Sequence, residues 1–133
     1  MRPSRALDAY FEHIVNLFAT VGTARLTDRR AVALEGASHG ALKLHVEYVG
    51  IGLTVLLYAD VSYGYPVWII YRIHVQRSDG TLLFRYDNAR HHPELDTFPH
   101  HKHVGADERV VPAEQPSIHR VANELATHLN LSS

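Results

Sequence analysis

The chain has 133 residues, which is enough for one hydrophobic core but not for two. Its formal net charge is −1 with neutral histidines, so any binding of nucleic acid has to rest on local charge. There is no cysteine, which excludes disulfides and thiolate metal sites. We therefore expect a single domain over residues 1–133.

Neither a membrane span nor a signal peptide is indicated by the sequence. Apolar runs stay well short of the ~20 residues that are needed to cross a bilayer. The N-terminal stretch MRPSRALDAYFEH holds acids and a histidine where a signal peptide has an apolar region. We expect a cytoplasmic protein with no membrane partner.

The predicted elements run from a helix through several strands to a second helix. The first segment repeats apolar residues at positions i, i+3, i+4 and i+7, which predicts an amphipathic helix up to Gly22. After the strands, Ser117 starts a second helical pattern. The fold class is therefore α+β, an antiparallel meander flanked by an N-terminal and a C-terminal helix, with a long histidine-rich loop. Strands are predicted at 31–35, 42–48, 53–58, 67–76 and 81–86.

The dipeptide Asp79-Gly80 predicts a tight two-residue turn between the last two of these strands. Because side chains alternate across a strand, one face of this hairpin is apolar and the other is polar. The turn would pair Arg72 with Asp87, His74 with Arg85, Val75 with Phe84 and Gln76 with Leu83. The apolar face would hold Tyr71, Ile73, Val75, Leu82, Phe84 and Tyr86, and the polar face Arg72, His74, Gln76, Arg85 and Asp87.

The polar face leads directly into the stretch FRYDNARHHPELDTFPHHKH, which runs from Phe84 to His103. It gathers five of the chain's eleven histidines and shows no regular period. Such a polar face can be simply solvated, since cross-strand ion pairs contribute only ~0.2–1 kcal/mol. A surface of arginine beside histidine is better explained if it binds an anion such as phosphate, which guanidinium groups hold through paired hydrogen bonds.

The string RYDNARHHPELDTFPHHKHVG, followed by an acidic residue, a proline and a serine before the last helix, resembles the TumE family. Members of this family are toxins of bacterial and archaeal toxin–antitoxin systems. The stretch YRIHVQ with Asp79-Gly80, and the strand LLFRYDNA, resemble the same family. The likeness covers roughly residues 71–129. It implies a small cytoplasmic toxin that pairs with a cognate antitoxin protein.

From the residues we expect the activity to be cleavage of RNA without a metal or another cofactor. Attack by a ribose 2′-hydroxyl needs a base, an acid and a cation for the charge that develops on phosphorus. Histidine can serve as either proton carrier, and arginine can hold the phosphate. The expected catalytic residues are His74, Arg85, Asp87, Asn88, His91 and His92, with Arg72, Gln76 and Lys102 binding the substrate.

Two alternatives stay open at this point. One is a histidine-ligated metal site, in which His101 and His103 would be joined by His91 or His92 and by Glu94 or Asp96. The other is a binding or scaffold domain without catalysis, whose loop histidines bond to backbone carbonyls and pin the loop to the sheet. A homodimer through an edge strand is also left open.

Overall fold

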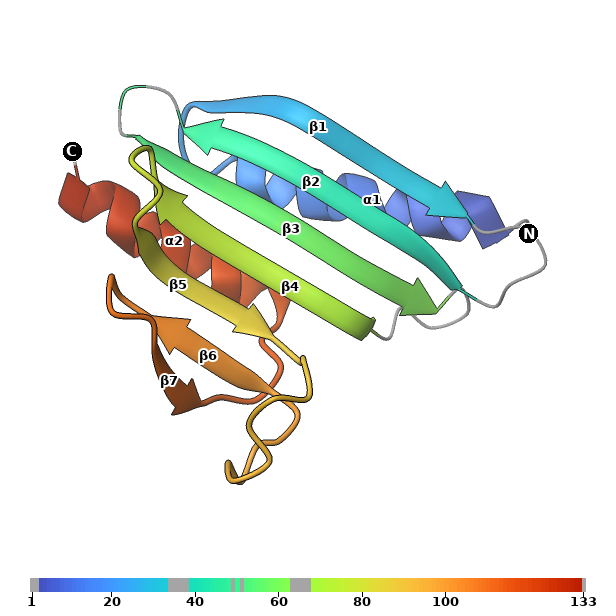
Figure 1. The fold of residues 1–133 in the computed structure, drawn as a ribbon. Coiled ribbons are helices and arrows are strands. Elements are labelled where there is room, and N and C mark those ends of the chain that lie inside the picture. Colours follow the sequence, from blue (N-terminus) through green and yellow to red (C-terminus); the bar gives the residue numbers. More distant parts are fainter. Residues whose placement is uncertain (1–2, 34–38, 49, 51, 63–67, 133) are drawn as a thin grey trace.

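A computed structural model describes residues 3–33, 39–48, 50, 52–62 and 68–132 of the chain (Figure 1). These residues form two helices and seven strands. In chain order they are α1 (Pro3–Ala19), β1 (Ala24–Ala33), β2 (His39–Tyr48), β3 (Leu53–Ser62), β4 (Trp68–Arg77), β5 (Leu82–Asp87), β6 (His101–Val104), β7 (Arg109–Pro112) and α2 (Ile118–Ser132).

The seven described strands form one antiparallel meander, in which each strand pairs with the one before it in the chain. Figure 1 shows α1 and α2 on the same side of this sheet, with α1 behind β1 and β2 and α2 toward β4 and β5. This arrangement confirms the predicted α+β class with two flanking helices. The opposite side of the sheet, called here the open face, carries neither α1 nor α2 (Figure 1).

The core lies between the sheet and the two helices. Alternate side chains of β2 to β5 point toward the helices, and residues such as Leu57, Ile73 and Phe84 are almost fully buried there. Phe18 from α1 and Leu125 from α2 close the same core. Burial of apolar surface contributes roughly 25 cal/mol per Å², so this face supplies most of the stability of the fold. None of the helices in the described residues is long and apolar enough to cross a bilayer.

The hairpin between β4 and β5 has the predicted position but a different turn. The Gly80 amide donates to the Arg77 carbonyl at 2.9 Å, and the Arg77 amide donates to the Thr81 carbonyl at 2.9 Å. Of the residues in this turn, Gly80 is the one with a positive φ, of 89°, so the loop is one residue longer than a two-residue turn. A bulge follows between Val75 and Gln76, which places Gln76 opposite Leu82 and not opposite Leu83. The other three predicted pairs are confirmed, namely Arg72 with Asp87, His74 with Arg85 and Val75 with Phe84.

Two regions of the sheet were placed differently by the sequence. The first strand covers Ala24–Ala33, whereas the predicted one covered 31–35, of which residues 34 and 35 lie outside the described part. The histidine-rich segment was expected to be one long loop, but its end forms β6, which pairs with β5 and with β7. The loop itself is confined to residues 88–100. The strand was not predicted because histidine counts as a polar residue in an alternation pattern, although His101 is buried.

Candidate functional site

The open face of β4, β5 and β6 carries two rows of polar side chains that run across the strands. The register places Arg85 between His74 and His103, and it places Asp87 between Arg72 and His101. Residues two apart in a strand share a face, so both rows project to the same side of the sheet. Strand pairing thus assembles imidazoles, guanidiniums and one carboxylate that are up to 31 residues apart in the chain.

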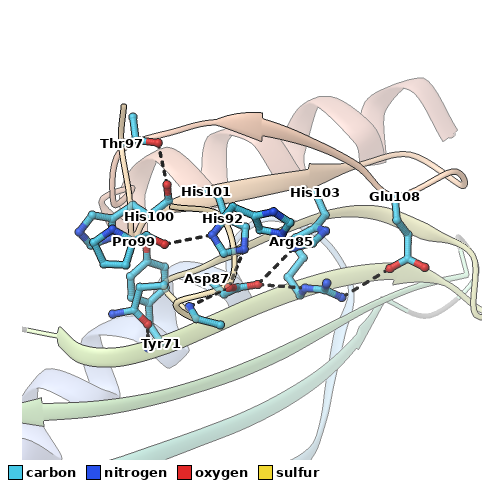
Figure 2. A network of polar contacts seen from close by, with 12 residues as sticks. Tyr71, Arg85, Asp87, His92, Thr97, Pro99, His100, His101, His103 and Glu108 are labelled. Atoms are coloured by element: carbon cyan, nitrogen blue, oxygen red, sulfur yellow. Dashed lines mark hydrogen bonds and ion pairs between the residues drawn. The ribbon is translucent and has the colours of Figure 1, made fainter. Parts of the chain in front are cut away.

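Asp87 is the centre of these contacts, and it is only 5% exposed. Arg85 Nε donates to Oδ2 at 3.2 Å, and the backbone amide of Ala89 donates to Oδ1 at 3.0 Å. His101 Nε2 lies 2.9 Å from Oδ1, and His103 Nε2 lies 3.7 Å from Oδ2 (Figure 2). A buried carboxylate costs several kcal/mol unless it is paired and hydrogen-bonded, and these groups supply that compensation.

His101 is held at both ring nitrogens. Its Nδ1 donates to the backbone carbonyl of Pro99 at 3.0 Å, since a carbonyl can only accept, and its Nε2 faces Asp87 (Figure 2). The side chain is 2% exposed. This contact to a backbone carbonyl matches the scaffold role that the sequence suggested for the loop histidines.

The loop at 88–100 is pinned to the sheet by further contacts. The Tyr71 hydroxyl and His100 Nδ1 are hydrogen-bonded at 2.9 Å, and their rings are stacked. The Thr97 hydroxyl donates to the His100 carbonyl at 2.7 Å and accepts from the Ala113 amide at 3.2 Å. Asn88 Oδ1 accepts a hydrogen bond from the Tyr71 backbone amide at 3.0 Å. The pinned loop brings His92 next to His101 and His103 of β6.

His92 is the loop residue that completes a cluster of three imidazoles with His101 and His103 (Figure 2). The ring centres lie 4.9 Å apart for His92 and His101, 5.0 Å for His101 and His103, and 6.0 Å for His92 and His103. One ring nitrogen of each histidine lies within 4.8 Å of the other two. The exposed carboxylate of Glu94 has its Oε1 3.4 Å from His92 Nδ1.

Among the clefts on this face, two neighbouring ones share both Arg72 and Arg85. The histidine cleft, of about 250 Å³, is lined by Arg72, Arg85, Asp87, Ala89, His91, His92, His101 and His103. The sheet cleft, of about 460 Å³, is lined by Asp28, Lys43, Leu44, His45, Leu56, Leu57, Tyr58, Arg72, His74 and Arg85. Arg72 and Arg85 therefore stand between His74 on one side and the loop histidines on the other.

The imidazoles of His74 and His103 are both held toward the neutral form. Burial is the main cause that lowers the pKa of His74, and the nearby guanidiniums of Arg85 and Arg72 lower it further, against the raising effect of the hydrogen bond to Gln76. Burial also lowers the pKa of His103, again with help from Arg85. At neutral pH, both rings are therefore available as proton acceptors.

Most of the expected site residues meet at these clefts. His74, Arg72, Arg85, Asp87, His91 and His92 line one or both of them. Asp87 is buried under its partners, so its position suits orientation of Arg85 and His101 better than contact with a substrate. His91 is exposed at the rim of the histidine cleft.

Three expected residues have other structural roles. The side-chain amide of Asn88 joins the loop to β4. Its Nδ2 donates to the Ile69 carbonyl at 2.9 Å, and its Oδ1 accepts from the Tyr71 backbone amide. Gln76 Oε1 accepts a hydrogen bond from His74 Nε2 at 2.8 Å, and Gln76 lines neither cleft. Lys102 points to the helix side, where it pairs with Glu124 of α2. Alternation within β6 explains this, because Lys102 lies between His101 and His103.

Glu108 is a site residue that the sequence did not reveal. Its carboxylate lies 3.8 Å from the Arg85 guanidinium and orients it from the side opposite Asp87 (Figure 2). It sits in the turn between β6 and β7 with a positive φ of 53°. Gly105 could have indicated a turn after β6 and so placed Glu108 near the site. The sequence did not predict β6, so this turn was not recognised.

The metal alternative acquires a defined set of ligand candidates in the described residues. The group that comes together is His92, His101 and His103, whereas His91 and Asp96, which the sequence also offered, are not part of it. Glu94 approaches only His92. Of the adjacent histidines at 91 and 92, only His92 joins the cluster.

Comparison with known proteins gives one family. No curated protein and no solved structure matches the chain. The family described as toxin TumE matches residues 17–129, which includes β1 to β7 and most of α2. This span is most of the 133 residues and contains both clefts. The chain therefore belongs to the TumE toxin family.

Proposed function

We propose that this toxin cleaves RNA by metal-independent acid–base chemistry at the two clefts of the open face. The family assigns the chain to the toxins of toxin–antitoxin systems, which implies an antitoxin partner. The RNA substrate and the chemistry are our proposal, and they rest on the residues that line the clefts.

The observation that carries the proposal is the shared position of Arg72 and Arg85 between the two clefts. A phosphodiester held by these guanidiniums would have His74 on one side and the loop histidines on the other. Arg85 is oriented by Asp87 and Glu108, and Arg72 is exposed toward the substrate. Displacement at phosphorus needs a base and an acid on opposite sides, so this arrangement suits it.

In the proposed reaction, neutral His74 removes the proton of a ribose 2′-hydroxyl. The 2′-oxygen attacks the adjacent phosphorus, and the bond from phosphorus to the 5′-oxygen of the next nucleotide breaks. A protonated loop histidine, His91 or His92, gives its proton to that leaving oxygen. The products are a 2′,3′-cyclic phosphate and a free 5′-hydroxyl. Arg72 and Arg85 stabilise the charge on the non-bridging oxygens during transfer.

The test is cleavage of a labelled RNA by the purified chain in excess EDTA. We expect cleavage in EDTA, a cyclic phosphate end, and no cleavage of DNA of the same sequence, because DNA lacks the 2′-hydroxyl. His74→Ala should lower the rate by about 10²–10⁴-fold, the usual contribution of a single acid or base. Arg72→Ala and Arg85→Ala should lower it as well.

A matched control is Arg77→Ala, since Arg77 lies at the end of the same strand as Arg72, is exposed, and lines neither cleft. It should retain the rate of the native chain. Absence of RNA cleavage by the native chain, with and without added metal, would remove the proposal and leave a binding or scaffold role. Equal loss in Arg72→Ala and Arg77→Ala would show that only the overall charge matters.

A further inference from the structure

We infer that His92, His101 and His103 form a binding site for one divalent transition metal ion of the zinc type. The inference goes beyond the proposed function, because it concerns binding of an ion and requires no RNA. It starts from the three ring nitrogens that lie within 4.8 Å of one another. Imidazole nitrogen is a preferred ligand of Zn²⁺, Co²⁺ and Ni²⁺.

The spacing lies within reach of a tetrahedral site. Zn–N bonds of about 2.0–2.1 Å place two ligand nitrogens about 3.3 Å apart in tetrahedral geometry. His101 and His103 are fixed by β6, where residues two apart project to one side. His92 belongs to the irregular loop at 88–100, so a small movement of this residue would close the remaining gap. Binding thus requires no rearrangement of the sheet.

The surroundings of His101 and His103 also suit metal binding. His101 Nδ1 donates a hydrogen bond to the Pro99 carbonyl. This bond fixes the ring and leaves Nε2 as the nitrogen that can bind an ion. Asp87 lies 2.9 Å from this Nε2 and 3.7 Å from His103 Nε2. The carboxylate is not among the ligand atoms that lie within 4.8 Å of one another, so it would balance the charge of a bound ion from beside the site.

A purely structural role explains His101 but not the cluster as a whole. His101 has hydrogen-bond partners at both nitrogens and is buried. The contact from His103 to Asp87, at 3.7 Å, is longer than a hydrogen bond, and His92 Nδ1 lies 3.4 Å from the exposed carboxylate of Glu94, which is outside the cluster. Hydrogen bonding therefore does not account for the orientation of His92 and His103 toward the same point, whereas a shared ion does.

Metal at this cluster has a consequence for the proposed chemistry. An ion bound there would occupy the side of the histidine cleft that faces Arg85, and it would take His92 away from proton transfer. Zinc is then expected to slow the metal-independent cleavage of RNA, whereas the chain freed of metal by EDTA cleaves at full rate. Binding itself is measured without RNA, so its result is separate from that of the cleavage test.

The experiment is titration of the metal-free full-length chain with ZnCl₂ by calorimetry, and with CoCl₂ by visible absorption. We expect one ion per chain and a Co²⁺ spectrum typical of tetrahedral coordination. His92→Ala and His103→Ala should each weaken binding by about 100-fold or more, because loss of a mere outer-shell partner already costs ~10–100-fold. His91→Ala is the matched control, since His91 is the exposed neighbour outside the cluster. Its affinity should stay within about threefold of native.

Another histidine pair on the surface must be distinguished from the cluster. His13 Nε2 and His119 Nε2 lie 3.4 Å apart on α1 and α2, and both side chains are exposed. The His13→Ala variant should leave the high-affinity site intact. Circular dichroism of each variant confirms the fold, and His101→Ala is avoided because that residue also supports Asp87. Absence of binding by the native chain, or binding that is lost in His13→Ala and kept in His92→Ala and His103→Ala, would overturn the inference.

Discussion

The two faces of the β4–β5 hairpin differ in the kind of interaction that buries their side chains. On the helix side, Ile73, Val75 and Phe84 are at most 1% exposed and contact other apolar side chains. On the open face, Asp87 is 5% exposed, and it is covered by Arg85 and by histidines of β6. Asp87 thus approaches the burial of the core residues, but through directional polar contacts and not through apolar packing.

This difference separates stability from chemistry within the same pair of strands. Apolar contacts are additive and tolerate exchange of one hydrophobic residue for another of similar volume. A buried carboxylate requires particular donors at particular positions. The stability contributed by the open face is therefore sensitive to the loss of a single donor or acceptor atom. The open face also leaves charged groups in two clefts, whereas the described core residues on the helix side carry no charged side chain.

The largest effect is expected from Phe84→Ala on the helix side. Phe84 is 1% exposed in the core, and truncation of a buried phenylalanine typically costs 3–5 kcal/mol, so we expect about 3–5 kcal/mol. Urea unfolding followed by circular dichroism measures this loss. Phe84→Met, which keeps most of the volume, should cost less than ~1.5 kcal/mol. A loss below ~1 kcal/mol in the alanine variant would show that this face is not the main source of stability.

Asp87→Ala on the open face should follow closely, at about 2–4 kcal/mol. Removal of one partner from a buried ion pair costs 3–5 kcal/mol, and the value is reduced here because the Arg85 side chain is 20% exposed. Asp87→Asn retains an oxygen for the Ala89 amide and should lose less than the alanine variant. If both variants unfold at the urea concentration of the native chain, the polar contacts on this face contribute no net stability.

A smaller effect is expected where the loop is joined to the sheet. Tyr71→Phe keeps the ring and removes the hydroxyl that bonds to His100, which should cost about 1 kcal/mol. Amide hydrogen exchange in the loop at 88–100 should become faster, while exchange in β2 and β3 stays the same. Tyr58→Phe is the matched control, because its hydroxyl bonds to Asp60 at the exposed surface. Equal effects of the two variants would mean that the Tyr71 contact does not hold the loop.

The smallest effect concerns the pH dependence of stability through His74. Burial lowers its pKa in the folded state, so below pH ~6.5 the unfolded chain binds this proton first. Stability from the neutral imidazole is therefore complete above pH ~6.5 and is lost as pH falls toward the lowered pKa. The free energy of unfolding, measured from pH 7.5 to 5, should fall less steeply in His74→Gln than in the native chain. Identical slopes would contradict the burial of His74 as a neutral group.

The sequence was sufficient for the hairpin because the information there is local. Alternation of apolar and polar residues assigned Ile73, Val75 and Phe84 to the core, and Arg72 and His74 to the open face. The dipeptide Asp79-Gly80 located the turn, although the turn type and the Gln76 pairing were wrong. The error stayed small since a bulge corrects the register within one residue.

Tertiary structure decided which residues of β6 and of the loop join the site. His101 and His103 reach Asp87 only because β6 pairs with β5. The two strands are separated by a loop of 13 residues, 88–100, whose sequence shows no periodic pattern of apolar residues. The same pairing turns Lys102 to the helix side, against the expected role in substrate binding. Local propensity and alternation depend on neighbours in the chain, so the sequence determined the strands of the hairpin and their two faces. The meeting of His92, His101 and His103 around one point depends on long-range pairing, which only the folded chain supplies.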